Sequence, residues 1–228
     1  MRLVFGKVVS LIDKGGVESE MRPHTDLFTN PSDDVGPLPP NGFEYRPDFL
    51  TLSEEAALIQ QLSALNFGEV RMHGVVAKRR VAHFGWVYGY DSWRLVPGPT
   101  IPDFLQLWRE RAAMLIGHAP DELAEILITE YPAGAGIGWH RDAPNFGPAV
   151  VGLSLGSACR FRFRREYAGK MESFTATLEP RSAYILGGEA RRHWQHSIPP
   201  AQVLRYSITF RTLSPMNNKP RAIVVKRA

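Results

Sequence analysis

The chain has 228 residues with a formal net charge of +4, and 44% of its residues are hydrophobic, which is typical of a folded globular protein and excludes a disordered one. No apolar run is long enough for a membrane-spanning helix, and residues 1–16 lack the long apolar stretch and cleavage site of a secretory signal. Cys159 is the only cysteine, so an intrachain disulfide and a cysteine-based zinc site are excluded. We expect a monomer that works in the cytoplasm, or in the nucleus if the source is eukaryotic, and that has no membrane partner.

The charged residues are distributed unevenly along the chain. Residues 141–228 contain 15 Lys and Arg against 5 Asp and Glu, whereas residues 1–140 contain 12 against 18. A basic half of this kind favours an anionic partner such as a phosphate backbone. An ordinary solvated surface explains the same asymmetry equally well.

Two helices are predicted after an N-terminal extension. Residues 1–42 are expected to form this extension, partly irregular, because its second half is rich in proline, glycine and aspartate. The folded domain is then expected over residues 43–228. Apolar residues recur at helical spacing over residues 53–65, which begin with the good N-cap residue Ser53, and again over residues 102–117.

Short β-rich runs separated by glycine and proline follow the second helix. Helices followed by about half a dozen strands indicate an α+β fold with a β-sandwich or jelly-roll core and N-terminal supporting helices. The predicted strands are Ile126–Tyr131, Ala149–Leu155, Arg160–Arg164, Ser173–Leu178, Ala183–Leu186 and Leu204–Thr212.

The first group that indicates metal chemistry is a His-x-Asp pair, His140 and Asp142. In an extended strand these two side chains point the same way, so they supply an imidazole and a carboxylate side by side. They would be two of the three ligands of a 2-His-1-carboxylate site for Fe(II). The third ligand would be His193 or His196, and we prefer His196 because the apolar Ile198 and a strand follow it.

Two arginines near the end of the domain favour an anionic ligand. Arg205, Ser207, Thr209 and Arg211 share one face of the last predicted strand. Arginines on the interior face of a sandwich are costly unless anions meet them, and 2-oxoglutarate offers two carboxylates. The alternative is an edge strand with both arginines in solvent.

Taken together, these residues resemble the AlkB family of 2-oxoglutarate dioxygenases over residues 75–213. The ordered combination of His-x-Asp, a distant His and Arg-x5-Arg is specific to this family, although each part alone is common. Further matching segments are Tyr131-Pro132 with Gly134, Val151-x-Leu153-Ser154-Leu155-Gly156, Phe161-x-Phe163, Gly187-Gly188-Glu189-x-Arg191 and His196-x-Ile198.

The resemblance implies a double-stranded β-helix with an iron site at its mouth, held by His140, Asp142 and His196. It implies that Arg205, helped by the hydroxyl of Tyr131, binds the distal carboxylate of 2-oxoglutarate. Arg211 would lie near the iron-bound end of this cosubstrate. The implied reaction uses O2 and 2-oxoglutarate to remove alkyl groups from N-alkylated bases of DNA or RNA, and it releases formaldehyde, succinate and CO2.

The sequence departs from the familiar pattern of this family at three positions. Thr129 and Ser207 stand where many members carry asparagine, and both can still hydrogen-bond a carboxylate of the cosubstrate. Pro144 stands where several DNA-repair members have an acidic residue that contacts the base. The identity of the substrate base therefore does not follow from the resemblance.

The family places its substrate lid at about residues 70–100. There a basic run, Lys78, Arg79 and Arg80, precedes a ladder of aromatic residues that begins at Phe84. Cations suit phosphates and aromatic faces suit an extruded base, although a ladder at this spacing is more often core. We expect Phe84 inside the core and the later members nearer the substrate. These later members are Trp86, Tyr88 and Tyr90.

A second basic cluster includes Arg164 and Arg165 and is a candidate edge for binding a nucleic-acid backbone, with a solvated strand face as the alternative. Cys159 is interpreted as a small buried hydrophobic residue. The remaining histidines show no ligand spacing and are interpreted as surface or loop residues: His24, His73, His83 and His118.

Two other functions compete with nucleic-acid dealkylation. One is a 2-oxoglutarate-dependent hydroxylase of a protein or small molecule, which the basic run and the aromatic ladder disfavour. The other is a module that binds modified nucleic acid without turnover. The complete set of predicted iron and cosubstrate residues argues against this module, because a protein without turnover has no need of all of them.

Overall fold

The computed structural model describes residues 37–72, 74–89 and 94–214. The predicted N-terminal extension lies almost entirely outside these ranges, and the predicted boundary between residues 42 and 43 stays a prediction. No helix among the described residues is long and apolar enough to cross a membrane.

The first helix, α1 (Leu52–Ser63), begins one residue before the predicted cap. Thr51 is the N-cap, and its side chain accepts a hydrogen bond from the backbone N–H of Glu54. The Glu54 carboxylate in turn accepts from the Thr51 N–H at 2.7 Å, which completes a capping box. The prediction that Ser53 caps this helix is therefore wrong, because Thr51, two residues earlier, is the N-cap and exchanges hydrogen bonds with Glu54.

The second predicted helix is present as two consecutive pieces. A short 3-10 helix, η1 (Asp103–Leu105), leads directly into α2 (Gln106–Ile116). Gly117 ends α2 in the left-handed conformation, with a φ of 66°, which costs glycine little. The predicted end of this helix is therefore confirmed.

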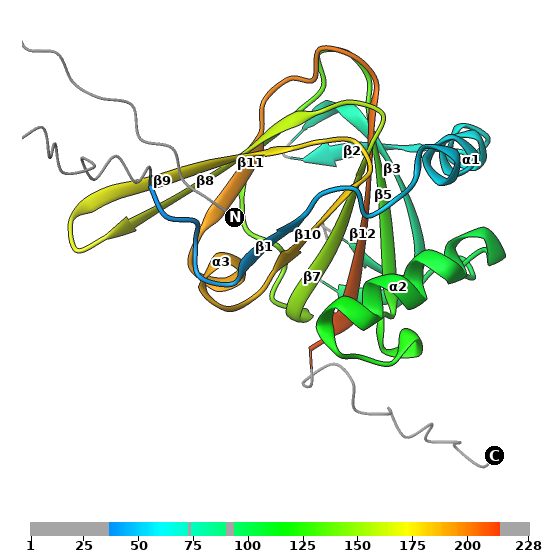
Figure 1. Ribbon diagram of the computed structural model, residues 1–228, viewed down its shortest axis with the longest axis horizontal. Helices are drawn as coiled ribbons and strands as arrows, with labels where there is room; N and C mark the ends of the chain where they lie inside the picture. Colours follow the sequence, from blue (N-terminus) through cyan, green and yellow to red (C-terminus); the bar gives the residue numbers. More distant parts are fainter. Residues whose placement is uncertain (1–36, 73, 90–93, 215–228) are drawn as a thin grey trace, which may run out of the picture. The chain divides into compact units, whose positions relative to one another are not determined.

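Eight of the described strands form one antiparallel sheet in the order β1-β10-β7-β12-β5-β3-β2, with β4 paired to β3. Figure 1 shows α1 and α2 on one side of this large sheet. The strands of the large sheet are β1 (Phe43–Arg46), β2 (Gly68–Met72), β3 (Val75–Gly89), β4 (Arg94–Pro97), β5 (Glu125–Tyr131), β7 (Phe146–Leu155), β10 (Ser182–Leu186) and β12 (Arg205–Leu213).

A smaller sheet, in the order β6-β11-β8-β9, holds the other four described strands. Its β8–β9 hairpin extends away from the large sheet in Figure 1. A short helix, α3 (Gly188–Arg192), connects β10 of the large sheet to β11 of the small one. The strands of the small sheet are β6 (Ile137–His140), β8 (Cys159–Tyr167), β9 (Lys170–Leu178) and β11 (Gln195–Ile198).

The large sheet is covered on both faces, and β12 lies at its centre between β7 and β5. Tyr206, Ile208 and Phe210 of β12 are buried in the cluster that includes α1 and α2. The alternate residues of β12 face the small sheet. The alternative of an edge strand with two solvated arginines is therefore wrong.

A second buried cluster fills the space between the two sheets, with Phe161 and Phe163 of β8 at its centre. Cys159 belongs to this cluster, as predicted, and burial raises the pKa of its thiol. Two facing antiparallel sheets with few helices confirm the predicted α+β fold with a jelly-roll core.

Candidate metal and cosubstrate site

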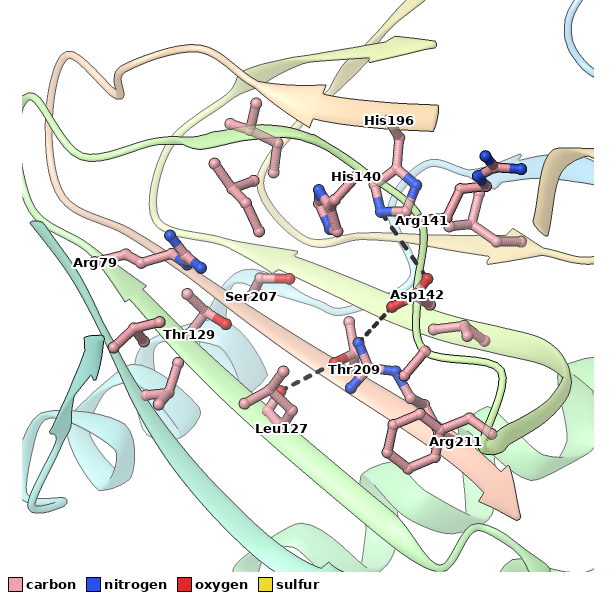
Figure 2. Close-up of a pocket in the computed structure, with 18 of the residues that line it drawn as sticks. Arg79, Leu127, Thr129, His140, Arg141, Asp142, His196, Ser207, Thr209 and Arg211 are labelled. Atoms are coloured by element: carbon pink, nitrogen blue, oxygen red, sulfur yellow. Dashed lines mark hydrogen bonds and ion pairs between the residues drawn. The ribbon is translucent and has the colours of Figure 1, made fainter. Parts of the chain in front are cut away.

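A cavity of about 560 Å³ opens between the two sheets. It is lined by residues of both sheets and of the loop that follows β6. Figure 2 shows His140 and His196 at one end of this cavity, with Asp142 next to them, and Thr129 and Ser207 further along its wall. The cavity has the size of a small-molecule site in proteins.

Strand pairing brings the two predicted histidine ligands together. β6 ends at His140, and β11 pairs with it so that His196 lies opposite His140, with 4.3 Å between the ring centroids. Asp142 lies just beyond the end of β6, with Oδ2 at 3.9 Å from Nε2 of His196. His193, the other candidate for the third ligand, is exposed at the C-terminal end of α3 and is not a cavity residue among the described ones.

The protonation of these side chains suits a bound cation. Burial lowers the pKa of His196 to about 3 and also lowers the pKa of His140, so both imidazoles are neutral at pH 7. Burial alone would raise the pKa of Asp142, but Arg211 and His196 outweigh it and hold this pKa well below its usual range. Two neutral imidazoles and an ionised carboxylate are the donor set of a non-haem Fe(II) site.

The hydrogen bonds around these residues also leave donor atoms available for a metal. Nδ1 of His140 lies 2.9 Å from the carbonyl oxygen of Gly138, so a proton on Nδ1 leaves Nε2 as the ligand atom. Oδ2 of Asp142 is buried without a hydrogen-bond partner among the described residues. In the described part of the chain, however, no three His, Cys, Asp or Glu side chains are already arranged to hold an ion, so a bound cation would have to draw these neighbours together.

Arg205 is fully buried and fits an anionic ligand. Its Nη2 donates to Oγ of Ser154 at 3.1 Å, and its guanidinium carbon lies 5.1 Å from the centre of the Tyr131 ring. Its Nε and Nη1 have no hydrogen-bond partner within the described residues. A buried guanidinium without a counter-ion is costly, so a carboxylate would complete this site.

The residues next to Arg205 form a polar wall of the cavity. Arg205 pairs with Tyr131 and Ser207 pairs with Thr129 in the register between β12 and β5. Tyr131, Thr129 and Ser207 all line the cavity, whereas Arg205 lies behind this wall. Together they offer hydroxyl groups and one guanidinium for a carboxylate such as the distal one of 2-oxoglutarate.

Arg211 has a different environment from Arg205. Its Nη1 donates to Oε2 of Glu125 at 2.9 Å and its Nη2 donates to Oδ1 of Asp142 at 2.8 Å, as Figure 2 shows for Asp142. All three side chains are almost completely buried. Arg211 therefore fixes one carboxylate oxygen of Asp142 and leaves the other oxygen for a metal.

The basic run on β3 is divided by the alternation of the strand. Arg79 is half-buried and lines the cavity, whereas Lys78 and Arg80 are exposed on the opposite face. Nε of Arg80 also donates to the carboxylate of Glu130 at 2.6 Å. Of these three residues, Arg79 points toward the site, and the substrate-binding role predicted for Lys78 and Arg80 stays a prediction.

The aromatic ladder is interrupted at Gly85, which has a φ of 77°. The positive φ breaks the regular alternation of side chains between Phe84 and Trp86, and a side chain at position 85 would meet the carbonyl oxygen of Ala124 at 2.1 Å. Phe84 packs against the helix-side core, as predicted, and Trp86 is half-buried outside the cavity lining. The side chain of Tyr88 and all of Tyr90 lie outside the described residues.

The predicted backbone-binding pair on β8 already has protein partners. Nε of Arg164 donates to Gln195 at 2.9 Å, and its guanidinium lies over the Trp139 ring at 4.4 Å. Arg165 forms ion pairs with Glu172 at 2.6 Å and Glu189 at 2.7 Å. These contacts favour a structural role for both arginines at the junction of β8 with its neighbours.

His83 and Glu125 are polar cavity residues that were not predicted from the sequence. His83 was interpreted as a surface or loop residue, but it lies on β3, lines the cavity, and its side chain is 17% exposed. Its Nδ1 lies 3.5 Å from Oε1 of Glu125, the carboxylate that also pairs with Arg211. The period-two pattern of Arg79, Val81 and His83 is the signal that could have placed His83 on the same face as Arg79.

The chain is similar to known proteins of one family. Residues 42–211 match the 2OG-Fe(II) oxygenase superfamily. A relative from Arabidopsis thaliana, "Alkylated DNA repair protein ALKBH8 homolog", is 30% identical over 177 residues, which cover 67% of this chain and 49% of that protein. The chain thus spans about half the length of this relative.

Two solved structures share the fold. "The structure of OsALKBH1" has a TM-score of 0.59 and 18% identity, and the match covers 77% of this chain and 98% of the other. A prolyl hydroxylase from Trichoplax adhaerens, in complex with a peptide of hypoxia inducible factor, has a TM-score of 0.57 and 15% identity over 78% of this chain and 86% of the other. The chain therefore belongs to the 2OG-Fe(II) oxygenase superfamily as a member of the AlkB family, and it is a dioxygenase that uses Fe(II), 2-oxoglutarate and O2.

Proposed function

We propose that this dioxygenase oxidatively removes alkyl groups from N-alkylated nucleic-acid bases and releases formaldehyde, succinate and CO2. The main support for the proposal is the cavity of about 560 Å³. The histidine–aspartate group and Arg79 of β3 line this same cavity. Its volume is sufficient for one extruded base beside the cosubstrate. The Arabidopsis thaliana relative is named an alkylated DNA repair protein, and this supports the same substrate class.

Each group of site residues has a role in this proposal. His140, Asp142 and His196 would hold Fe(II), which supplies the oxidising chemistry when bound together with O2. Arg205 would bind the distal carboxylate of 2-oxoglutarate, with hydroxyl groups of the neighbouring wall as further donors. Arg211 would hold Asp142 in place and Arg79 would contact the substrate. The neighbouring wall is formed by Tyr131, Thr129 and Ser207.

The test is succinate formation from 2-oxoglutarate with a panel of methylated and unmethylated DNA and RNA oligonucleotides. We expect succinate formation to rise only with methylated strands, and the panel identifies the preferred base and sugar. Equal succinate formation with methylated and unmethylated strands would contradict the proposal.

A second candidate is hydroxylation of a protein side chain. The fold is compatible with it, because the TM-scores of the AlkB-type structure and the prolyl hydroxylase are similar, 0.59 and 0.57. Fold alone thus does not separate the two substrate classes. Stimulation of succinate formation by proline-containing peptides, and not by methylated oligonucleotides, would support this candidate.

A further inference from the structure

A second cavity, of about 630 Å³, lies beside the loop that carries Asp142. Arg141, Asp142, Pro144 and Phe146 line both this cavity and the first one, so the two cavities adjoin. A ligand that extends out of the first cavity past this loop would therefore enter the second.

The lining of the second cavity carries an excess of positive charge. Arg141, Arg191 and Arg192 contribute guanidinium groups, and none of them forms a salt bridge with a carboxylate of the described residues. Asp142 is the acidic residue of the lining, and its side chain is already paired with Arg211 at 2.8 Å. The Asp142 carboxylate also attracts Arg191, so within the described residues one carboxylate faces three arginines and already forms a salt bridge with Arg211.

Arg191 is the buried member of these three arginines and is held in place by two hydrogen bonds to backbone carbonyl groups. It is 7% exposed, and its Nη1 and Nη2 donate to the carbonyl oxygens of Asp142 at 3.0 Å and Ala143 at 2.8 Å. Its Nε is buried without a hydrogen-bond partner among the described residues. A buried cation in this state is stabilised when an anion binds next to it.

We propose that the second cavity binds a phosphodiester group of the nucleic-acid strand, adjacent to the base held in the first cavity. This inference rests on the proposed function and deepens it by naming where the strand is held. Guanidinium groups suit phosphate oxygens because they donate in pairs. Arg141 and Arg192 are the exposed members, and Nη1 of Arg141 donates to the carbonyl oxygen of Arg192 at 3.4 Å.

The test compares two single substitutions of exposed arginines that lack a salt bridge within the described residues. Arg192 lines the second cavity, whereas Arg160 on β8 lines neither cavity. We expect Arg192→Gln to weaken binding of a methylated single-stranded oligonucleotide about tenfold and to reduce its salt slope by about 0.7. Arg160→Gln should leave both quantities at the wild-type values.

A second experiment distinguishes binding of a phosphate within the strand from binding of free phosphate. The same variants are titrated with a methylated nucleoside, with and without inorganic phosphate. The ratio of oligonucleotide to nucleoside affinity should fall in Arg192→Gln. If the nucleoside with inorganic phosphate binds as tightly as the strand, and does so through Arg192, the site takes free phosphate and the proposal is wrong.

The remaining outcomes are also decisive. Equal losses in Arg192→Gln and Arg160→Gln would mean diffuse attraction, and no loss in either would mean that the cavity does not hold the strand. Either result would overturn the phosphate site. The proposed function would still stand if methylated oligonucleotides stimulate succinate formation. If methylated oligonucleotides neither bind nor stimulate succinate formation in the wild type, the proposed function itself fails and this inference fails with it.

Discussion

The two arginines of β12 lie on the same face of one strand but have different partners. Arg211 is neutralised by Glu125 and Asp142, whereas Arg205 forms no salt bridge with the described residues and lies beside the hydroxyl of Ser154, the ring of Tyr131 and the thiol of Cys159. The sequence predicts that both arginines share one face of the strand, because the alternation of β12 is regular. It does not predict their partners, because these come from β5, β7 and the loop after β6.

Arg205→Ala should raise the concentration of 2-oxoglutarate needed for half-maximal succinate formation by at least about tenfold. The lost charge-assisted pair contributes roughly 1.5–3 kcal/mol. Arg205→Lys should restore only part of this affinity, because an ammonium does not reproduce the paired donors of a guanidinium. An unchanged 2-oxoglutarate requirement in Arg205→Ala would remove this role from Arg205.

The choice between the two candidate histidines is tested by direct iron binding. His196→Ala should abolish stoichiometric Fe(II) binding, because His196 lies opposite His140 and next to Asp142. His193→Ala should bind Fe(II) like the wild type, because His193 is exposed at the end of α3. The assignment is wrong if the two variants show the reverse pattern.

The buried pair between Glu125 and Arg211 should contribute far more to stability than a surface pair. Glu125→Gln replaces a carboxylate that is 1% exposed by a neutral amide and leaves Asp142 as the charged partner of Arg211, so we expect a loss of about 1.5–3 kcal/mol in the free energy of unfolding. Glu69→Gln, which breaks the exposed pair with Arg71, serves as the control and should have no measurable effect. Chemical denaturation measures both, and equal effects would contradict this account of Arg211.

At the scale of elements, regular patterns were predicted correctly and local irregularities were not. The six predicted strands are present because their apolar runs are bounded by glycine and proline. Short elements such as β6, β11 and α3 have too few residues for a clear spacing of apolar residues, so they were not predicted as strands or helices. The sequence indicated only the possible metal ligands in β6 and β11, His140 and His196. The aromatic ladder of β3 was expected to be continuous, and Gly85 breaks it because its backbone adopts a positive φ.

The start of α1 gives a stability test at the scale of elements. Thr51→Ala removes the side chain that accepts the Glu54 N–H, and we expect a loss of about 1 kcal/mol in the free energy of unfolding. Ser53→Ala should cost clearly less, because Ser53 is inside the helix and is not its cap. A larger loss in Ser53→Ala than in Thr51→Ala, measured by chemical denaturation, would restore the prediction made from the sequence.

For the whole molecule, the sequence predicts the jelly-roll class but not the geometry of the cavities. His83 and Glu125 are 42 positions apart in the numbering and meet only because β3 pairs with β5. The second cavity likewise combines the loop after β6, the start of β7 and α3. Such groups depend on strand order and register, which the alternation within a single strand does not contain.

The central claim is that this dioxygenase oxidises the alkyl group of a nucleic-acid base. It is tested most directly by incubating the protein with Fe(II), 2-oxoglutarate and an oligonucleotide that carries one isotope-labelled N-methyl base. We expect labelled formaldehyde and succinate to form in equal amounts, together with an oligonucleotide that has lost the methyl group. Succinate formed without labelled formaldehyde, from any methylated DNA or RNA strand, would contradict the claim.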